Sequence, residues 1–170
     1  MTWLEQLVRE FYEVQGYWVR TNVRFEPTGH GGYAGEADIL AWDSESNVLL
    51  HVETTLATTA WSDRSKRIEK QFTKATHHYE EMFPLPRGRI TRVEKVAILR
   101  ISRNSKGMKQ GIPGAKLVPL GEFMCQVADL VTARFRGNRS PPEQYPLLRT
   151  IYFLKKAERE AVSGTGGERR

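Results

Sequence analysis

Two short runs of apolar residues, separated by a polar turn, stand out in the first third of the chain. Residues 33–42 and 48–55 are rich in aliphatic and aromatic side chains, and residues 43–47 between them read D-S-E-S-N. Strand-forming runs on either side of a turn of this composition predict an antiparallel hairpin. Both runs also contain acids, which are poor strand formers and are rarely buried unless their charge is compensated.

The acids of this hairpin can be assigned to faces, because side chains alternate along a strand. Glu36 and Asp38 share a face of the first strand, and Glu53 shares a face of the second with His51 and Thr55. Three carboxylates can therefore converge, and the hard oxygens of Asp38 and Glu53 are ligands that Mg²⁺ prefers. The alternative is a solvated face carrying ordinary acids, since antiparallel sheets commonly leave one face in water.

The spacing of apolar residues predicts the elements around the hairpin. Residues 2–14 predict a helix, residues 17–25 a strand, and residues 63–83 one long helix whose apolar positions are three or four apart. The basic stretch 102–116 contains glycines and no acid, so we expect a loop that is disordered until it meets a partner. The remaining predicted elements are strands over 93–101 and 116–120 and helices over 120–135 and 143–160.

Length and charge indicate a basic protein built on one core. A chain of 170 residues is long enough for one domain, which we expect over residues 1–162, followed by a disordered tail over 163–170. The net charge of +6 favours polyanions, with nucleic acid as the natural candidate. The single cysteine, Cys125, excludes an internal disulfide, and we expect it in the core. No apolar run is long enough for a signal peptide or a membrane span, which predicts a cytoplasmic protein without a membrane partner.

The predicted order helix, strand, strand, strand, helix, strand carries acids on the first helix and on the second and third strands. This pattern resembles the PD-(D/E)XK nuclease superfamily, whose members carry G-E-x-D before two hydrophobic residues and then, after a turn, V-E-x-K. Residues 35–40 match as G-E-A-D-I-L, residues 51–55 match as H-V-E-T-T, and Glu5 corresponds to the glutamate of the first helix. Over roughly residues 2–101, the resemblance implies an α/β fold with a restriction-endonuclease-like αβββαβ core. A mixed central sheet flanked by helices, with extra C-terminal helices, is expected.

The resemblance also implies an activity, namely Mg²⁺- or Mn²⁺-dependent hydrolysis of DNA phosphodiester bonds by an endonuclease. Asp38, Glu53 and the main-chain carbonyl of Val52 correspond to the metal ligands, and Glu36 or Glu5 would orient ligands or waters. The fold hosts several substrates, so an RNA- or nucleotide-directed member stays open. Action as a homodimer or with a partner subunit also stays open.

One position departs from the family pattern. Thr55 stands where the motif has lysine, and a threonine neither carries positive charge nor acts well as a general base. A lysine of the following helix substitutes for it, the metal alone supplies the hydroxide, or the site is inactive. Lys66 and Lys70 are the candidates for the first outcome, with solvated helix lysines as the ordinary reading. Gln71 lies in the helix region where some relatives carry a site glutamine.

Basic residues on and after that helix are candidates for phosphate contacts, which position a duplex without reading its sequence. They are Arg64, Lys66, Arg67, Lys70, Lys74, Arg103, Lys106 and Lys109. The rival function is a catalytically inactive module of nuclease fold that binds DNA or a protein. Thr55 favours this rival, whereas the retained acids favour the nuclease because an unused acidic cluster would repel phosphate. Metal binding discriminates the two.

Overall fold

The computed structural model describes residues 1–137 and 139–164, without the side chains of the last two. Its contacts divide the chain into two compact units, Met1–Gly121 and Glu122–Arg170, and each is described by itself. The single domain expected over residues 1–162 stays a prediction.

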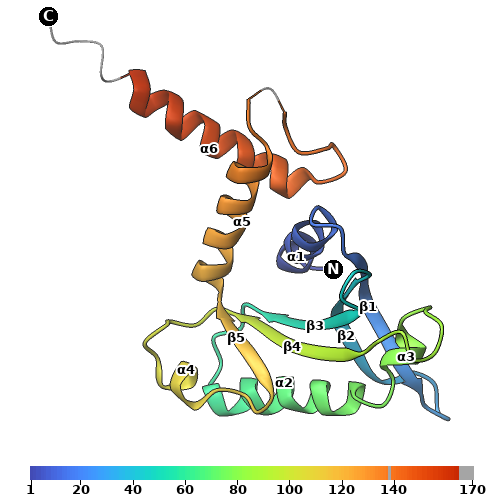
Figure 1. The fold of residues 1–170 in the computed structure, drawn as a ribbon. Helices are drawn as coiled ribbons and strands as arrows, with labels where there is room; N and C mark the ends of the chain where they lie inside the picture. The colour runs from blue at the N-terminus through green and yellow to red at the C-terminus, as the bar shows by residue number, and fades with distance from the viewer. Residues whose placement is uncertain (138, 165–170) are drawn as a thin grey trace, which may run out of the picture. The chain divides into compact units, whose positions relative to one another are not determined.

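The first unit is built on one mixed sheet of five strands in the order β1-β2-β3-β4-β5 (Figure 1). The strands are β1 (Trp18–Pro27), β2 (Tyr33–Asp43), β3 (Val48–Thr55), β4 (Arg92–Leu99) and β5 (Ala115–Pro119). Strand β2 is antiparallel to both neighbours, whereas β3, β4 and β5 run parallel. The α/β fold with a mixed sheet flanked by helices is confirmed, and the restriction-endonuclease-like core itself stays a prediction.

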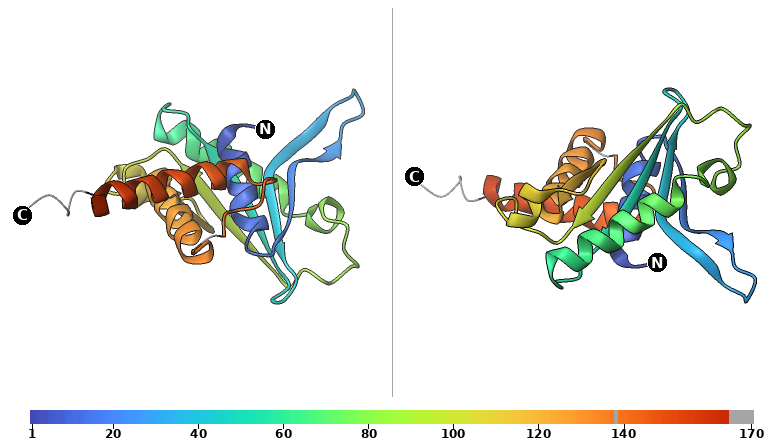
Figure 2. Two further views of the ribbon diagram at one scale, coloured as in Figure 1. Left: turned by 90° about the horizontal axis from the view of Figure 1, so that it is seen from above. Right: turned by 90° about the horizontal axis from the view of Figure 1, so that it is seen from below.

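Two helices cover opposite faces of this sheet, α1 (Trp3–Glu13) on one and α2 (Trp61–Ala75) on the other (Figures 1 and 2). Each helix turns one apolar stripe towards the strands, as a surface helix must. On α2 the stripe consists of Ile68, Phe72 and Ala75, all of them buried. Its partners in the core include Ala97 and Leu99 of β4. The prediction that apolar residues three and four apart form the buried face of this helix is therefore confirmed over the length of α2.

The long helix predicted over residues 63–83 is wrong, because the chain leaves the helical path after α2. Helix α2 ends at Ala75, and a separate short helix, α3 (Tyr79–Met82), follows. The hydroxyl of Thr76 donates to the Phe72 carbonyl at 2.8 Å, a bond that bends helices. Thr76 and the two histidines that follow it are also weak helix formers. The break lets Tyr79 and Met82 pack in the core beside β1 and β2.

The disordered loop predicted over residues 102–116 is also wrong. It contains a short helix, α4 (Lys106–Gln110), whose N-cap Ser105 accepts a hydrogen bond from the Met108 amide at 3.3 Å. Gly107 is buried against Trp61, where an added Cβ would lie 2.6 Å from the indole ring. Gly107 therefore permits close packing here and does not mark a flexible loop.

The second unit contains most of α5 (Leu120–Arg134) and all of α6 (Pro146–Gly164). The prediction that Cys125 lies in the core is wrong, because the residue is exposed. It stands midway between the buried Phe123 and Val127, about half a turn from their stripe. Of the tail predicted over 163–170, the first two residues continue the backbone of α6, and residues 165–170 lie outside the described part of the chain.

Within the residues that the structure describes, no helix is both long enough and apolar enough to cross a membrane.

Candidate functional site

The candidate site lies where β2 separates from β3, a place called here the β2–β3 fork. The pairing of these strands stops at Ile39 and Val52, whereas β1 and β2 stay paired for a further stretch. Figure 2 shows the β1–β2 hairpin extending past the rest of the sheet. Asp38 and Glu53 are the next residues on the two strands after the last pair. The carbonyl of Val52, predicted as a metal ligand, belongs to that last pair.

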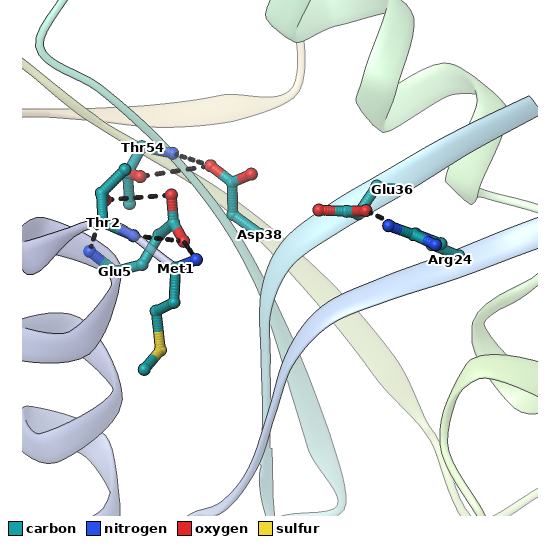
Figure 3. Close-up of polar contacts among 7 residues, drawn as sticks. All are labelled: Met1, Thr2, Glu5, Arg24, Glu36, Asp38 and Thr54. Carbon is teal, nitrogen blue, oxygen red and sulfur yellow. Dashed lines mark hydrogen bonds and ion pairs between the residues drawn. The ribbon is translucent and has the colours of Figure 1, made fainter. Parts of the chain in front are cut away.

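Asp38 replaces the missing strand pairing with its side chain (Figure 3). Its Oδ2 accepts hydrogen bonds from the amide of Thr54 at 2.8 Å and from the hydroxyl of Thr54 at 3.2 Å. The amide of Asp38 donates to Oε1 of Glu53 at 3.5 Å, which brings the two acids together. Oδ1 of Asp38 accepts no hydrogen bond from the described residues, so it is open to a ligand.

Glu53 is held by a buried chain of side chains. Its Oε1 lies 2.8 Å from Nε2 of His51, and Nδ1 of His51 lies 2.8 Å from the Tyr79 hydroxyl. Burial lowers the pKa of His51 to about 3, so the ring is neutral and has one donor and one acceptor nitrogen. With Glu53 ionised, Nε2–H donates to the carboxylate and the Tyr79 hydroxyl donates to Nδ1. Oε2 of Glu53 accepts no hydrogen bond in the described part of the chain.

The acid pair, Asp38 and Glu53, lies where charge is costly. Burial, followed by the charge of Glu53, raises the pKa of Asp38 to about 7, although the Thr54 hydrogen bonds oppose the rise. Burial raises the pKa of Glu53 to about 8 against the lowering effects of the Asp38 amide and of Arg67. No lysine or arginine among the described residues forms an ion pair with either carboxylate. Without a cation, the pair therefore retains a proton near neutral pH.

This donor set fits a small divalent ion. No group of three or more histidine, cysteine, aspartate or glutamate side chains in residues 1–137 and 139–162 could hold a metal. Mg²⁺ usually takes only one or two carboxylates and completes its coordination with water and phosphate oxygens. Asp38 and Glu53 each offer one open oxygen, and the charge of a divalent cation would offset the cost of ionising both.

The other two predicted acids have partners of their own (Figure 3). Glu5 closes a capping box on α1, where its oxygens accept from the amide and hydroxyl of Thr2 at 2.9 and 3.0 Å. It lies close enough to Asp38 that its charge contributes to the raised pKa there, after burial and Glu53. Glu36 pairs with Arg24 at 3.0 Å, and its charge is one of the smaller causes that raise the pKa of Glu53. Two carboxylates, not three, meet at the fork.

The position of the motif lysine holds a hydroxyl that binds an arginine. Thr55 is buried, and its Oγ1 accepts hydrogen bonds from Nη2 of Arg67 at 3.3 Å and from the amide of Ala57 at 3.1 Å. Arg67 projects from α2, and its charge lowers the pKa of Glu53, although burial dominates that pKa. The cation beside the acid pair is thus a guanidinium that the sequence placed only among the phosphate contacts.

The other α2 candidates divide into two groups. Lys66 and Lys70 are exposed, and neither makes a hydrogen bond or ion pair within the described residues. Gln71 and Lys74 follow Arg67 at steps of four and three, so the three share one side of the helix. Lys74 donates to the Ala34 carbonyl of β2 at 2.6 Å. Gln71 is half-buried between the two anchored residues, on the side of α2 that contacts the strands of the fork.

The remaining basic candidates also differ in what they contact. Arg64 donates to the carbonyls of Ala57 and Arg100 at 3.0 and 3.1 Å, so its guanidinium stabilises the chain after β3. Arg103, Lys106 and Lys109 are exposed on and before α4. Their phosphate contacts stay a prediction.

Sequence reasoning missed two features of this site. Strand alternation places His51 on the face of Glu53, but it does not show that the ring joins Glu53 to the Tyr79 hydroxyl. The break after Ala75, which turns Tyr79 towards His51, had no predicted counterpart. The Arg67–Thr55 contact could be found only from the phase of α2 relative to β3, which the sequence does not specify.

No family model, curated protein or solved structure matches the chain. A function for this site therefore has to be argued from its residues.

Proposed function

We propose that this protein is a metal-dependent nuclease that hydrolyses DNA phosphodiester bonds at the β2–β3 fork. The observation that carries the proposal is the acid pair itself, because two carboxylates are buried together without an ion pair to any described lysine or arginine, and each keeps one oxygen open. Such a pair destabilises the fold, and strongly perturbed carboxylates of this kind cluster at functional sites. The order α1-β1-β2-β3-α2-β4, with acids on α1, β2 and β3, supports the resemblance to PD-(D/E)XK nucleases.

In this proposal Asp38, Glu53 and the Val52 carbonyl hold one or two Mg²⁺ or Mn²⁺ ions. When bound, the metal lowers the pKa of a water molecule and stabilises negative charge on the phosphate. Hydrolysis forms a bond from the water oxygen to phosphorus and breaks the bond to the leaving deoxyribose oxygen, which receives the proton that the water loses. The His51–Tyr79 chain fixes the orientation of Glu53, as outer partners of metal ligands commonly do. Glu5 and Glu36 have partners of their own and are left out of this mechanism, so their role in orienting bound waters stays a prediction.

Arg67 takes over part of the task of the absent lysine. A guanidinium cannot be deprotonated in a protein, so Arg67 cannot serve as a general base. It can form paired hydrogen bonds with phosphate oxygens and stabilise the charge that develops there. The hydroxyl of Thr55 holds this guanidinium beside the acid pair. Lys66 and Lys70 are then left for contacts along the phosphate backbone.

A second candidate function is a module that binds DNA or a protein and has lost the chemistry. The observation that favours it is Thr55, since no lysine reaches the acid pair among the described residues. A module of this kind would bind DNA without binding metal.

The deciding experiment compares the wild type with Asp38→Asn and with Glu36→Gln, an acid two residues away on the same strand that has its own partner. Calorimetric titration with Mg²⁺ and Mn²⁺ measures metal binding, and nicking of supercoiled plasmid measures activity, with an RNA substrate in parallel. We expect both signals in the wild type and in Glu36→Gln and their loss in Asp38→Asn. No metal heat and no nicking, with DNA binding intact, would establish the non-catalytic module instead.

A further inference from the structure

The second unit contains a pocket of its own, called here the α5–α6 pocket, with a volume of about 340 Å³. It lies between the end of α5 and the middle of α6, and all of its lining residues belong to the second unit. Its polar lining consists of Thr132, Arg136, Tyr152, Lys155, Lys156 and Arg159. No acid lines it, and its volume falls within the range of small-ligand pockets.

The charges of this lining leave two guanidinium groups available. Lys155 pairs with Glu158 at 2.8 Å, and Lys156 pairs with Glu160 at 4.0 Å, so neighbouring acids already offset these two lysines. The side chains of Arg136 and Arg159 make no hydrogen bond or ion pair within residues 1–137 and 139–162. A free guanidinium presents a planar set of donors that matches the oxygens of a phosphate group.

A tyrosine hydroxyl and an aromatic ring complete the pocket. Tyr152 is 9% exposed and lines the pocket, and its hydroxyl forms no hydrogen bond with any described residue. The hydroxyl is therefore available to donate to a ligand atom. Phe135 also lines the pocket and is half-buried, so an aromatic surface lies among the cations. Cations interleaved with aromatic rings are typical of surfaces that bind nucleic-acid strands.

We propose that the α5–α6 pocket binds a phosphodiester of a nucleic-acid strand. Arg136 and Arg159 hold the phosphate oxygens, the Tyr152 hydroxyl donates to one of them, and Phe135 contacts the attached nucleoside. This binding site is separate from the acid pair and does not depend on the activity of that pair.

The test measures binding of fluorescein-labelled single-stranded and duplex DNA by anisotropy, using the full chain in EDTA so that no cleavage occurs. The double variant Arg136→Gln/Arg159→Gln is compared with Arg134→Gln/Arg139→Gln, which removes the same charge from exposed residues outside the pocket lining. We expect the first to weaken binding by about tenfold or more, as for lost hydrogen bonds to charged groups. It should also make the salt dependence of affinity shallower, because fewer counterions are released. The control should change affinity less than about threefold.

Equal losses in the two double variants would overturn the proposal, because net charge alone would then explain binding. Tyr152→Phe keeps the ring and removes only the hydroxyl, so it guards against unfolding. We expect an unchanged circular dichroism spectrum and a loss of affinity of about threefold to tenfold. Unchanged affinity in this variant would remove the hydroxyl from the site and contradict its stated role.

Competition separates the sources of the ligand. If deoxyadenosine monophosphate at millimolar concentration does not displace the labelled DNA, the pocket binds a nucleic-acid strand and not a free nucleotide. Displacement at micromolar concentration would keep the phosphate chemistry and assign the pocket to a free nucleotide. Poly-L-glutamate that competes as well as DNA of equal charge would overturn the assignment in favour of an acidic polypeptide.

Discussion

Glu5 and Glu53 are almost equally removed from water, with 9% and 6% of their surfaces exposed, yet their surroundings are opposite. Both oxygens of Glu5 accept hydrogen bonds from Thr2, and the terminal amino group of Met1 lies 3.8 Å away. Glu53 keeps Oε2 open and has Asp38 beside it, whose pKa it helps to raise. A buried acid surrounded by local donors completes a helix terminus, whereas a buried acid beside another acid favours a bound cation, because no described lysine or arginine forms an ion pair with it.

The largest effect should come from removing one of the paired acids. Asp38→Asn keeps a hydrogen-bond acceptor for Thr54 but removes the charge, so we expect plasmid nicking to fall by at least about a hundredfold, as for loss of a metal that generates the nucleophile. Calorimetry should show no metal heat in this variant. Glu36→Gln, which only breaks an exposed pair with Arg24, should keep both signals. Equal losses of nicking and of metal heat in Asp38→Asn and Glu36→Gln would contradict the prediction that Asp38 binds the metal and Glu36 does not.

The second effect is on the pH dependence of the free energy of unfolding, measured in EDTA so that no metal is bound. The folded-state pKa values of about 7 for Asp38 and about 8 for Glu53 exceed those of the unfolded chain, near 4. Between these values the folded state binds more protons, so its free energy of unfolding should fall as pH rises from about 4 to about 8. We expect a loss on the order of a few kcal/mol, since each pKa unit is worth about 1.4 kcal/mol.

Urea titrations at pH 5 and pH 9 measure this loss. The double variant Asp38→Asn/Glu53→Gln should lose less stability between the two values, and saturating Mg²⁺ should stabilise the wild type most at the higher pH. A wild type that gains stability with pH in EDTA would show that the acid pair is compensated after all.

A smaller effect should follow from removing the cation beside the pair. Arg67→Gln should lower kcat by about tenfold to a hundredfold, because a donor to the phosphate is lost, while the metal affinity changes little. Arg67→Lys should recover part of the rate. Lys66→Gln and Lys70→Gln serve as matched changes on the same helix and should weaken DNA binding more than they lower kcat. If Lys66→Gln or Lys70→Gln lowers kcat as much as Arg67→Gln, that lysine and not Arg67 replaces the motif lysine.

The smallest effect should come from Glu5, whose two carboxylate oxygens already accept hydrogen bonds from Thr2. Glu5→Gln and Thr2→Ala each disturb the capping box of α1, so we expect each to reduce the free energy of unfolding by about 1 kcal/mol. Denaturant titration measures this loss, and calorimetry should show that the affinity for Mg²⁺ changes less than about threefold in Glu5→Gln. A tenfold or greater loss of metal affinity would assign Glu5 the role of orienting bound waters.

Much of the first unit could be predicted because its signals are local. The periods of α1 and α2 and the polar turn between β2 and β3 follow from short stretches of sequence, and so did the candidacy of Asp38 and Glu53. The break after Ala75 could not be predicted from the sequence. It depends on the hydrogen bond from the Thr76 hydroxyl to the Phe72 carbonyl and on the burial of Tyr79 in the core, and neither is visible in the apolar spacing. Strand alternation alone assigns Glu36 to the site, and it does not show the ion pair that Glu36 forms with Arg24 of the neighbouring strand β1.

The hydrogen bond from the Thr54 amide to Asp38 also has a practical consequence for solution work. In a completed pairing of β2 with β3 this amide would donate to a main-chain carbonyl, but at the fork it donates to a carboxylate at 2.8 Å. A hydrogen bond to an ionised acceptor is shorter and stronger than one to a neutral acceptor. The proton resonance of this one backbone amide therefore reports the charge on Asp38, so a nuclear magnetic resonance titration can follow the site directly without any substrate.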